Sequence, residues 1–255
     1  MKDFAALFNA VDQTTKTTVK VAALAEYFTT AAEEDRLWTV ALFSGRRPKR
    51  AVTTTKLREW ASEASGVPLW LFEDSYAIVG DLAETIALVL PPVENDDTGT
   101  LTAWINALRG LKEEDDTARK AFVLSAWQQL GGTERFLFNK LITGGFRIGI
   151  SQKLMTRALS RASGRPEPEM AHRLMGNWHP DDVTWHSLIE AEDASADASR
   201  PYPFYLAYAL EDGPEALGTP EDWRAEWKGD GIRGQLILRD GDYFVWSRGE
   251  ELMTD

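Results

Sequence analysis

The sequence predicts a mainly α-helical chain that ends in the first strands of a β-rich region. From the start of the chain to about residue 190, apolar residues recur at helical spacing between Gly and Pro breaks. Beyond Asp222 the apolar period becomes two, and an Asp-Gly pair separates two strand-like runs. We therefore expect an all-helical domain over residues 1–195, an acidic, Pro-containing linker over 196–222, and the opening of a second domain over 223–255.

The clearest helix is expected at Asp81–Leu90, where Leu82, Ile86 and Val89 lie on one face and Asp81 can cap the first turn. The same spacing predicts further helices, in chain order, at Lys20–Thr30, Glu34–Phe43, Thr54–Ala64, Leu101–Leu108, Thr117–Leu130, Thr133–Thr143, Ser151–Ala162 and Glu167–Met175. Four tryptophans fall inside these patterns, which favours core positions over exposed stacking platforms: Trp38, Trp60, Trp104 and Trp127.

The end of the chain carries a linker signal and then a hairpin signal. Residues 192–200 are small and polar, and Pro201 and Pro203 stiffen the next part of the chain, as in a linker or a strap along a neighbouring surface. Asp240-Gly241 between β-rich runs is the strongest short-range indication of a hairpin.

A two-residue hairpin loop at Asp240-Gly241 has a defined register. It pairs Arg239 with Asp242, and counting outward places Arg233 opposite Arg248. Two arginines directly across a ladder repel each other, whereas an anion between them would make them a clamp. The alternative is an exposed hairpin whose arginines diverge into water, because register can slip by one residue.

The charge of the chain is unevenly distributed. Its 255 residues carry a net charge of −12, which argues against a nucleic-acid partner until the local field is considered. The segment Arg46–Arg58 has six basic residues and no acid, and Arg135–Arg165 has seven and no acid. The acidic residues are concentrated in Asp181–Asp222. The charge distribution is therefore compatible with a DNA-binding surface on the basic segments.

Composition excludes several other classes of site and partner. The chain has no cysteine, which excludes disulfides, thiolate nucleophiles and cysteine-held metals. The three histidines lack metal-ligand spacing, so we predict no metal site in this chain. No apolar run approaches the ~20 residues that cross a bilayer. We expect a cytoplasmic monomer without a membrane partner.

Two loops are candidates for contact with an anionic backbone. Gly45 ends a helix and Pro48 stiffens the next residues, so four cations should point outward: Arg46, Arg47, Lys49 and Arg50. Such a run is more often an ordinary solvated face. In the second loop, glycines let backbone amides turn toward one point before a helix that begins near Ser151. Its residues of interest are Gly144, Gly145, Arg147, Gly149 and Lys153. The alternative is a helix C-cap at Gly144 and a routine turn.

Lys228 lies just upstream of the predicted hairpin and its paired arginines. Neighbouring positive charge disfavours an ammonium, which helps a lysine to stay neutral and nucleophilic. Guanidiniums beside it would balance the charge on a transferring phosphate. This combination suits attack on a phosphorus atom.

The segment Lys228-Gly229-Asp230-Gly231-Ile232-Arg233 resembles the KxDGxR motif of covalent nucleotidyltransferases, which are DNA ligases, RNA ligases and capping enzymes. Glu226 and the Ser247-Arg248 pair resemble the same family. The helical segments 45–50, 81–85, 144–149 and 173–176 resemble the N-terminal DNA-binding domain of ATP-dependent DNA ligases, most closely the bacterial branch. Capping enzymes and most RNA ligases lack such a helical region.

The resemblance implies roles for individual residues. Lys228 would take AMP from ATP, with Mg²⁺ balancing the triphosphate charge, and the segment at Glu226 would contact adenine. Arg233 and Arg248 would bind ribose and phosphate oxygens, and Asp230-Gly231 would shape the turn. The two loops would hold nicked duplex DNA through sequence-independent backbone contacts.

The resemblance also implies that the chain is the N-terminal portion of a ligase, with its DNA-binding domain and the first part of its adenylation domain. Further family motifs and an OB-fold domain would follow Asp255, so we expect no complete joining reaction from this chain alone. The alternative is a non-catalytic DNA-binding module with a vestigial lysine segment; a weaker one is an RNA-joining enzyme. The sequence does not distinguish replication from repair.

Overall fold

The computed structural model describes residues 1–93, 99–146, 149–176, 178–191, 200–204, 210, 212–224, 227, 229, 231, 233–248 and 252–254. The chain forms two compact units. The first contains residues 1–170 and 179–190, and the second contains residues 171–178 and 191–255.

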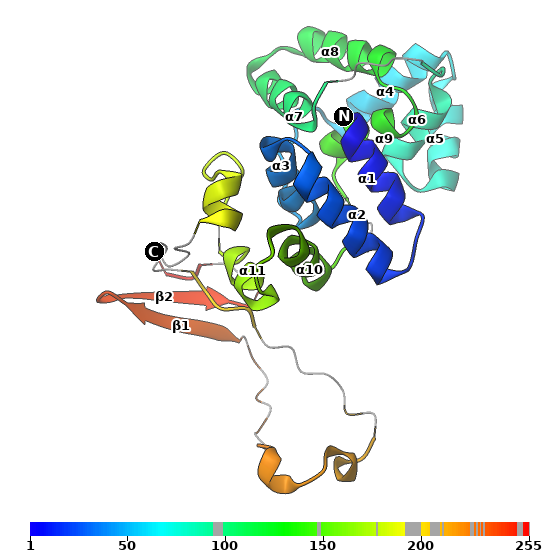
Figure 1. The fold of residues 1–255 in the computed structure, drawn as a ribbon. Helices are drawn as coiled ribbons and strands as arrows, with labels where there is room; N and C mark the ends of the chain where they lie inside the picture. The colour runs from blue at the N-terminus through cyan, green and yellow to red at the C-terminus, as the bar shows by residue number, and fades with distance from the viewer. Residues whose placement is uncertain are drawn as a thin grey trace. The chain divides into compact units, whose positions relative to one another are not determined.

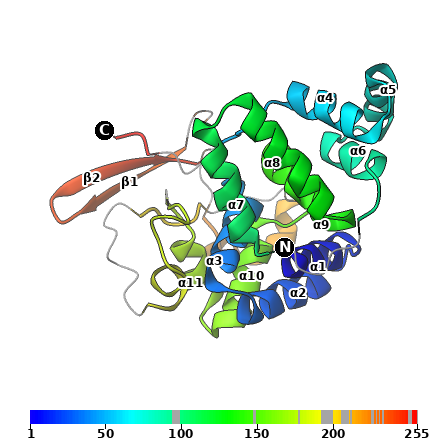
Figure 2. The same ribbon diagram turned by 90° about the horizontal axis from the view of Figure 1, so that it is seen from above.

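The first unit is helical throughout (Figures 1 and 2). Its helices are α1 (Lys2–Asp12), α2 (Thr17–Thr30), α3 (Glu33–Phe43), α4 (Thr54–Ser65), α5 (Leu69–Val79), α6 (Leu82–Val89), α7 (Leu101–Gly110), α8 (Asp116–Gln129), α9 (Gly132–Thr143) and α10 (Gln152–Ser163), with the short turns η1 (Leu111–Glu113) and η2 (His186–Glu190). Helix α11 (Glu167–Arg173) runs from the first unit into the second. The mainly helical class is confirmed.

The nine predicted helices are present, with ends within three residues of those expected. Helices α1 and α5 were not among them. Helix α5 buries only Phe72, while Trp70 and Ile78 on its surface are exposed. A helix that is apolar around much of its circumference has no one-sided stripe, so its periodicity is weak.

Two sets of helix contacts organise much of the first unit. Helix α2 packs against α1 and α10, and α1 also contacts α9. Helices α4, α5 and α6 pack against one another at one end of the unit, and α6 joins this group to α9 (Figures 1 and 2). Trp38, Trp60 and Trp127 are buried as predicted, while Trp104 is half-buried against Phe138.

Side-chain caps explain where several helices begin. Asp81 accepts a hydrogen bond of 3.2 Å from the Glu84 amide, which confirms the predicted cap of α6. Asp35 of α3 caps the start of α7, although the two are far apart in the sequence. Its carboxylate accepts hydrogen bonds from the Leu101 and Thr102 amides at 3.1 and 2.8 Å. The buried carboxylate thereby satisfies amides that the helix itself leaves unpaired.

Arg135 forms a second polar contact in the core. The residue is 2% exposed, and its guanidinium donates to the carbonyl oxygens of Leu130 and Trp127 at 2.8 Å and to that of Leu90 at 3.3 Å. It therefore caps the C-terminal ends of α6 and α8 together. Burial lowers the pKa of this guanidinium. In the sequence, Arg135 belongs to a basic segment that is compatible with a DNA-binding surface. The structure buries its side chain in the core, so Arg135 does not contribute to such a surface.

The second unit contains the predicted hairpin, formed by β1 (Gly234–Arg239) and β2 (Asp242–Ser247), and the short turns η3 (Pro214–Leu217) and η4 (Pro220–Asp222). Asp240 and Gly241 both have positive φ, 54° and 91°, as a two-residue hairpin turn requires. Arg239 pairs with Asp242, and the Arg248 amide donates to the Arg233 carbonyl at 3.1 Å. The predicted register is confirmed.

The segment that precedes the hairpin lies against it within the second unit. The Tyr202 amide donates to Gln235 Oε1 at 3.0 Å, and Gln235 Nε2 donates back to the Tyr202 carbonyl. The Tyr202 ring stacks on the His172 ring, with their centroids 5.2 Å apart. The Cζ atom of Arg239 lies 5.3 Å from the centroid of the same Tyr202 ring. The stiff residues around Pro201 thus form a strap on β1, one of the two interpretations expected.

Among the helices that the structure describes, none combines the length and apolar character needed to cross a bilayer.

Candidate functional site

The loop after α3 begins with a helix ending that turns the chain sharply. The Gly45 amide donates to the Leu42 carbonyl at 3.1 Å, and the Arg46 amide donates to the Ala41 carbonyl at 2.8 Å. This is a Schellman ending, and it requires the positive φ of 83° that Gly45 supplies. Gly45 ends the helix as predicted.

Beyond this turn, Pro48 is buried while Arg47, Lys49 and Arg50 are exposed. Pro48 therefore anchors a loop that carries exposed cations on both sides of it. Arg46 is half-buried and not fully outward, which corrects the expectation that four cations are presented together. Within the described ranges, Arg47, Lys49 and Arg50 form no ion pair with an acidic side chain.

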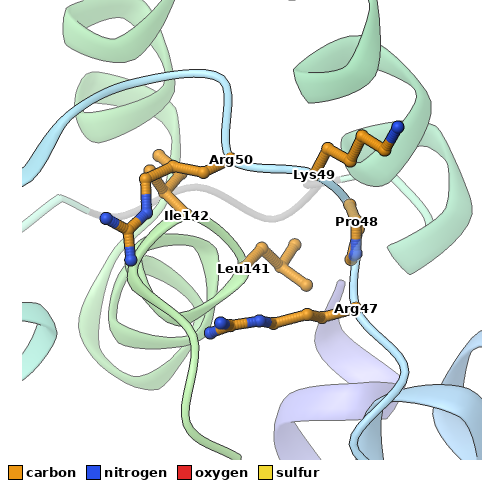
Figure 3. Close-up of a pocket in the computed structure, with 6 residues that line it drawn as sticks. All are labelled: Arg47, Pro48, Lys49, Arg50, Leu141 and Ile142. Atoms are coloured by element: carbon orange, nitrogen blue, oxygen red, sulfur yellow. The ribbon is translucent and has the colours of Figure 1, made fainter.

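The three cations line a hollow of about 400 Å³ whose floor includes Leu141 and Ile142 at the end of α9. Figure 3 shows the guanidiniums of Arg47 and Arg50 extending to the same side, Arg47 past Leu141 and Arg50 past Ile142, while Lys49 points away. An apolar floor beneath two guanidiniums lowers the local dielectric, which strengthens their attraction for an anion.

The glycine loop begins where α9 ends, next to this hollow. Gly144, Gly145 and Gly149 all have positive φ, at 83°, 93° and 64°. At Gly144 a β-carbon would overlap the Arg47 guanidinium, so the two candidate loops, almost 100 residues apart in sequence, are in direct contact. Gly144 also ends α9, because its amide donates to the Lys140 carbonyl at 2.8 Å. The helix ending expected as the alternative is therefore present at Gly144, and the binding of an anion by this loop stays a prediction.

The loop leads into α10. Ser151 caps this helix by accepting a hydrogen bond of 3.2 Å from the Leu154 amide, and Lys153 is exposed in its first turn. The first turn of a helix favours negative charge near its free amides. Arg147 lies outside the described residues.

Five other members of the two basic segments are ion-paired with acids. Lys56 pairs with Asp116, and its hydrogen bond lowers the pKa of that carboxyl. Further pairs are Arg58–Glu73 at 3.0 Å, Arg157–Glu167 at 3.9 Å, Arg165–Glu169 at 2.7 Å and Lys140–Asp81. Among the described residues of these two segments, the exposed cations that form no ion pair with an acid are therefore Arg47, Lys49, Arg50 and Lys153 on or beside the loops, and Arg161 on α10.

One cation beside the glycine loop was not among the predicted site residues. Lys20 of α2 is 8% exposed, and a β-carbon at Gly149 would lie 3.3 Å from its Nζ. A sequence signal for it exists, because Lys20 shares one helical face with Leu24 and Phe28, which are fully buried. Lysine is rarely buried in a protein core, so a lysine on the apolar face of a helix is a signal that the sequence contains.

The candidate nucleotide-binding residues lie in the second unit. Arg233 and Arg248 are exposed on neighbouring strand ends, and within the described ranges neither is paired with an acid. The register places the two residues opposite each other, which is the arrangement from which the sequence predicts a phosphate clamp. Gly231 is described and exposed, whereas Glu226, Lys228 and Asp230 lie outside the described residues. No cluster of three or more His, Asp or Glu side chains is arranged for a metal ion in the described part of the chain.

The fold and the site define a class of chain: a helical unit in which a cationic loop contacts a glycine loop beside an open hollow lined by arginine and lysine. The model of a family described as "DNA ligase N terminus" matches residues 1–160. The chain belongs to this family, and the resemblance inferred from the sequence is confirmed.

Three curated relatives are similar over larger or smaller parts of the chain. A probable DNA ligase of Koribacter versatilis (strain Ellin345) is 25% identical over 96% of this chain and 44% of its own length. One of Dictyoglomus thermophilum is 24% identical over 98% of this chain and 45% of its own. One of Sorangium cellulosum is 27% identical over 51% of this chain and 25% of its own. The chain thus spans less than half the length of each relative.

Proposed function

We propose that this chain is the DNA-binding and nucleotide-attacking part of an ATP-dependent DNA ligase, which seals nicks in duplex DNA. The observation that carries the proposal is the contact of Arg47 with Gly144, which joins the cationic loop and the glycine loop into one surface. Both loops fall within residues 1–160, the part that matches the ligase family model. The relatives' printed names support the same reaction class.

In this proposal the first unit holds the DNA backbone. Guanidiniums of Arg47 and Arg50, the Lys49 and Lys153 ammoniums, and loop amides contact phosphates on both sides of a nick. Such contacts fix the position of the protein without reading bases, as an enzyme that joins any sequence requires.

In the second unit, Lys228 is the nucleophile. Its neutral Nζ attacks the α-phosphorus of ATP, a P–N bond forms, the P–O bond to pyrophosphate breaks, and the amine loses a proton. Arg233 and Arg248 bind the oxygens of the phosphate that is transferred. We include Mg²⁺ as the ion that accompanies the triphosphate. The AMP then passes to a 5′-phosphate, and attack by the 3′-hydroxyl joins the strands and releases AMP.

Removing two loop cations should weaken DNA binding and change its dependence on salt. For the variant Arg47→Met with Arg50→Met, we expect the slope of log K against log salt to decrease by about 0.9 for each phosphate that the protein no longer neutralises. Fluorescence anisotropy with labelled nicked duplexes of several sequences, over a range of salt concentrations, measures it.

Lys112→Met is the matched control, because Lys112 is an exposed lysine on η1 that is ion-paired with Glu113. It should leave the slope unchanged. An unchanged slope in the double variant, or a strong preference of the protein for one DNA sequence, would contradict the proposed backbone grip.

The function itself is tested by incubating the full-length protein with labelled ATP and Mg²⁺, and then with nicked duplex DNA. We expect a covalent protein–AMP adduct and then joined strands, with nicked DNA preferred over nicked RNA. DNA binding without an adduct would identify a non-catalytic binding module instead, and preferential joining of RNA would identify an RNA ligase.

A further inference from the structure

Lys20 occupies a position where a charged side chain needs a specific reason. Helix α2 packs against α10, and the residues one and two turns after Lys20, Leu24 and Phe28, are 0% and 1% exposed. Lys20 itself is 8% exposed. Burying an ammonium costs free energy unless polar atoms surround it. Its Nζ lies next to Gly149, because a β-carbon added to Gly149 would lie 3.3 Å from it.

The glycine loop is therefore bordered by a cation at each described end. Arg47 packs on Gly144 at the start of the loop, and Lys20 approaches Gly149 at its end. The two cations differ in exposure. Arg47 is exposed and can reach a phosphate directly, whereas Lys20 as a residue is 8% exposed.

We propose that Lys20 is a positioning residue for the glycine loop, an inference that rests on the proposed function for its DNA-binding part. An ammonium has three donors and no acceptor, so it holds a backbone through carbonyl oxygens. Carbonyl groups drawn toward Lys20 leave the opposite edge of the peptide units, with their N–H groups, available to an anion. Lys20 acts on DNA through the loop, without touching a phosphate.

The effect on the loop is measured without DNA. In Lys20→Met, which keeps the length of the buried stem, the amides of Gly145, Gly149 and Ile150 should exchange hydrogen roughly ten-fold faster, the scale of one charge-assisted hydrogen bond. Amides of α6 and α9 should exchange as before. This result does not depend on the ligase assignment, so its failure overturns the inference alone.

The effect on DNA binding has a signature that separates positioning from direct contact. Lys20→Met should lower the affinity for nicked duplex roughly ten-fold while the salt slope stays as in the unaltered protein, because no phosphate contact is removed. Arg47→Met should lower affinity and decrease the slope by about 0.9. A decrease of that size in Lys20→Met would make Lys20 a direct phosphate contact and overturn positioning.

A second substitution, in the glycine loop itself, tests the inference if Lys20→Met fails to fold. Gly149→Ala places a methyl group 3.3 Å from the Lys20 Nζ, so the ammonium has to shift by a few tenths of an ångström, and a smaller loss of affinity at an unchanged slope is expected. Gly66→Ala is its control, because Gly66 has a similar φ of 72° with no atom within 4 Å of an added β-carbon. Equal effects of both substitutions would overturn the inference. If the unaltered protein binds no duplex DNA, the proposed function fails instead.

Discussion

Replacing Lys228 by alanine in the full-length protein is expected to abolish the covalent AMP adduct, a loss of at least about 10³-fold in its rate of formation. Alanine has no nucleophile, and ATP hydrolysis by water would leave nothing attached to the protein. The adduct is followed by gel autoradiography with labelled ATP and located by mass spectrometry of peptides. Lys228→Arg should be equally inactive, because a guanidinium stays protonated and cannot attack phosphorus.

The paired arginines provide a graded test of the same site. Arg233→Met or Arg248→Met should slow adduct formation by about 10²-fold while Lys228 remains the labelled residue. Lys112→Ala, remote in sequence and exposed on η1, should label at the normal rate. An adduct that persists in Lys228→Ala would place the nucleophile elsewhere and reject the proposed chemistry.

Arg135→Met should destabilise the helical unit by about 3 kcal/mol or more. Methionine fills the space but donates no hydrogen bond, so the carbonyl oxygens of Leu130, Leu90 and Trp127 lose their partner inside the protein. A buried acceptor left unpaired costs about 1–3 kcal/mol. Urea unfolding followed by tryptophan fluorescence measures the effect as a lower midpoint at an unchanged m-value.

Arg119→Met is the matched control for Arg135. Arg119 also caps backbone carbonyls, those of Leu111 and Lys112, at 2.9 and 2.8 Å, but part of its site is open to solvent. Water replaces the missing donor there, so the expected cost is below about 1 kcal/mol. Equal destabilisation by the two variants would show that burial of the acceptors is not the cause.

Some features of this chain follow from local sequence. Asp240-Gly241 determines the hairpin turn and, through it, the pairing of every residue out to Arg233 and Arg248, because a two-residue loop admits one register. Helix boundaries arise in the same way from nearby signals, such as the Asp81 cap and the Gly45 ending. These interactions join residues within a few positions of each other, so a single sequence contains them.

The role of each cation was decided only by tertiary structure. Arg135 and Arg47 are the same residue type in basic segments, yet one caps helices in the core and the other borders an open hollow. The contacts of Arg47 with Gly144 and of Lys20 with Gly149 join segments roughly 100 or more residues apart. No local pattern specifies such contacts, because they depend on how the helices pack. The role of Lys228 is a prediction from its motif and its neighbouring guanidiniums.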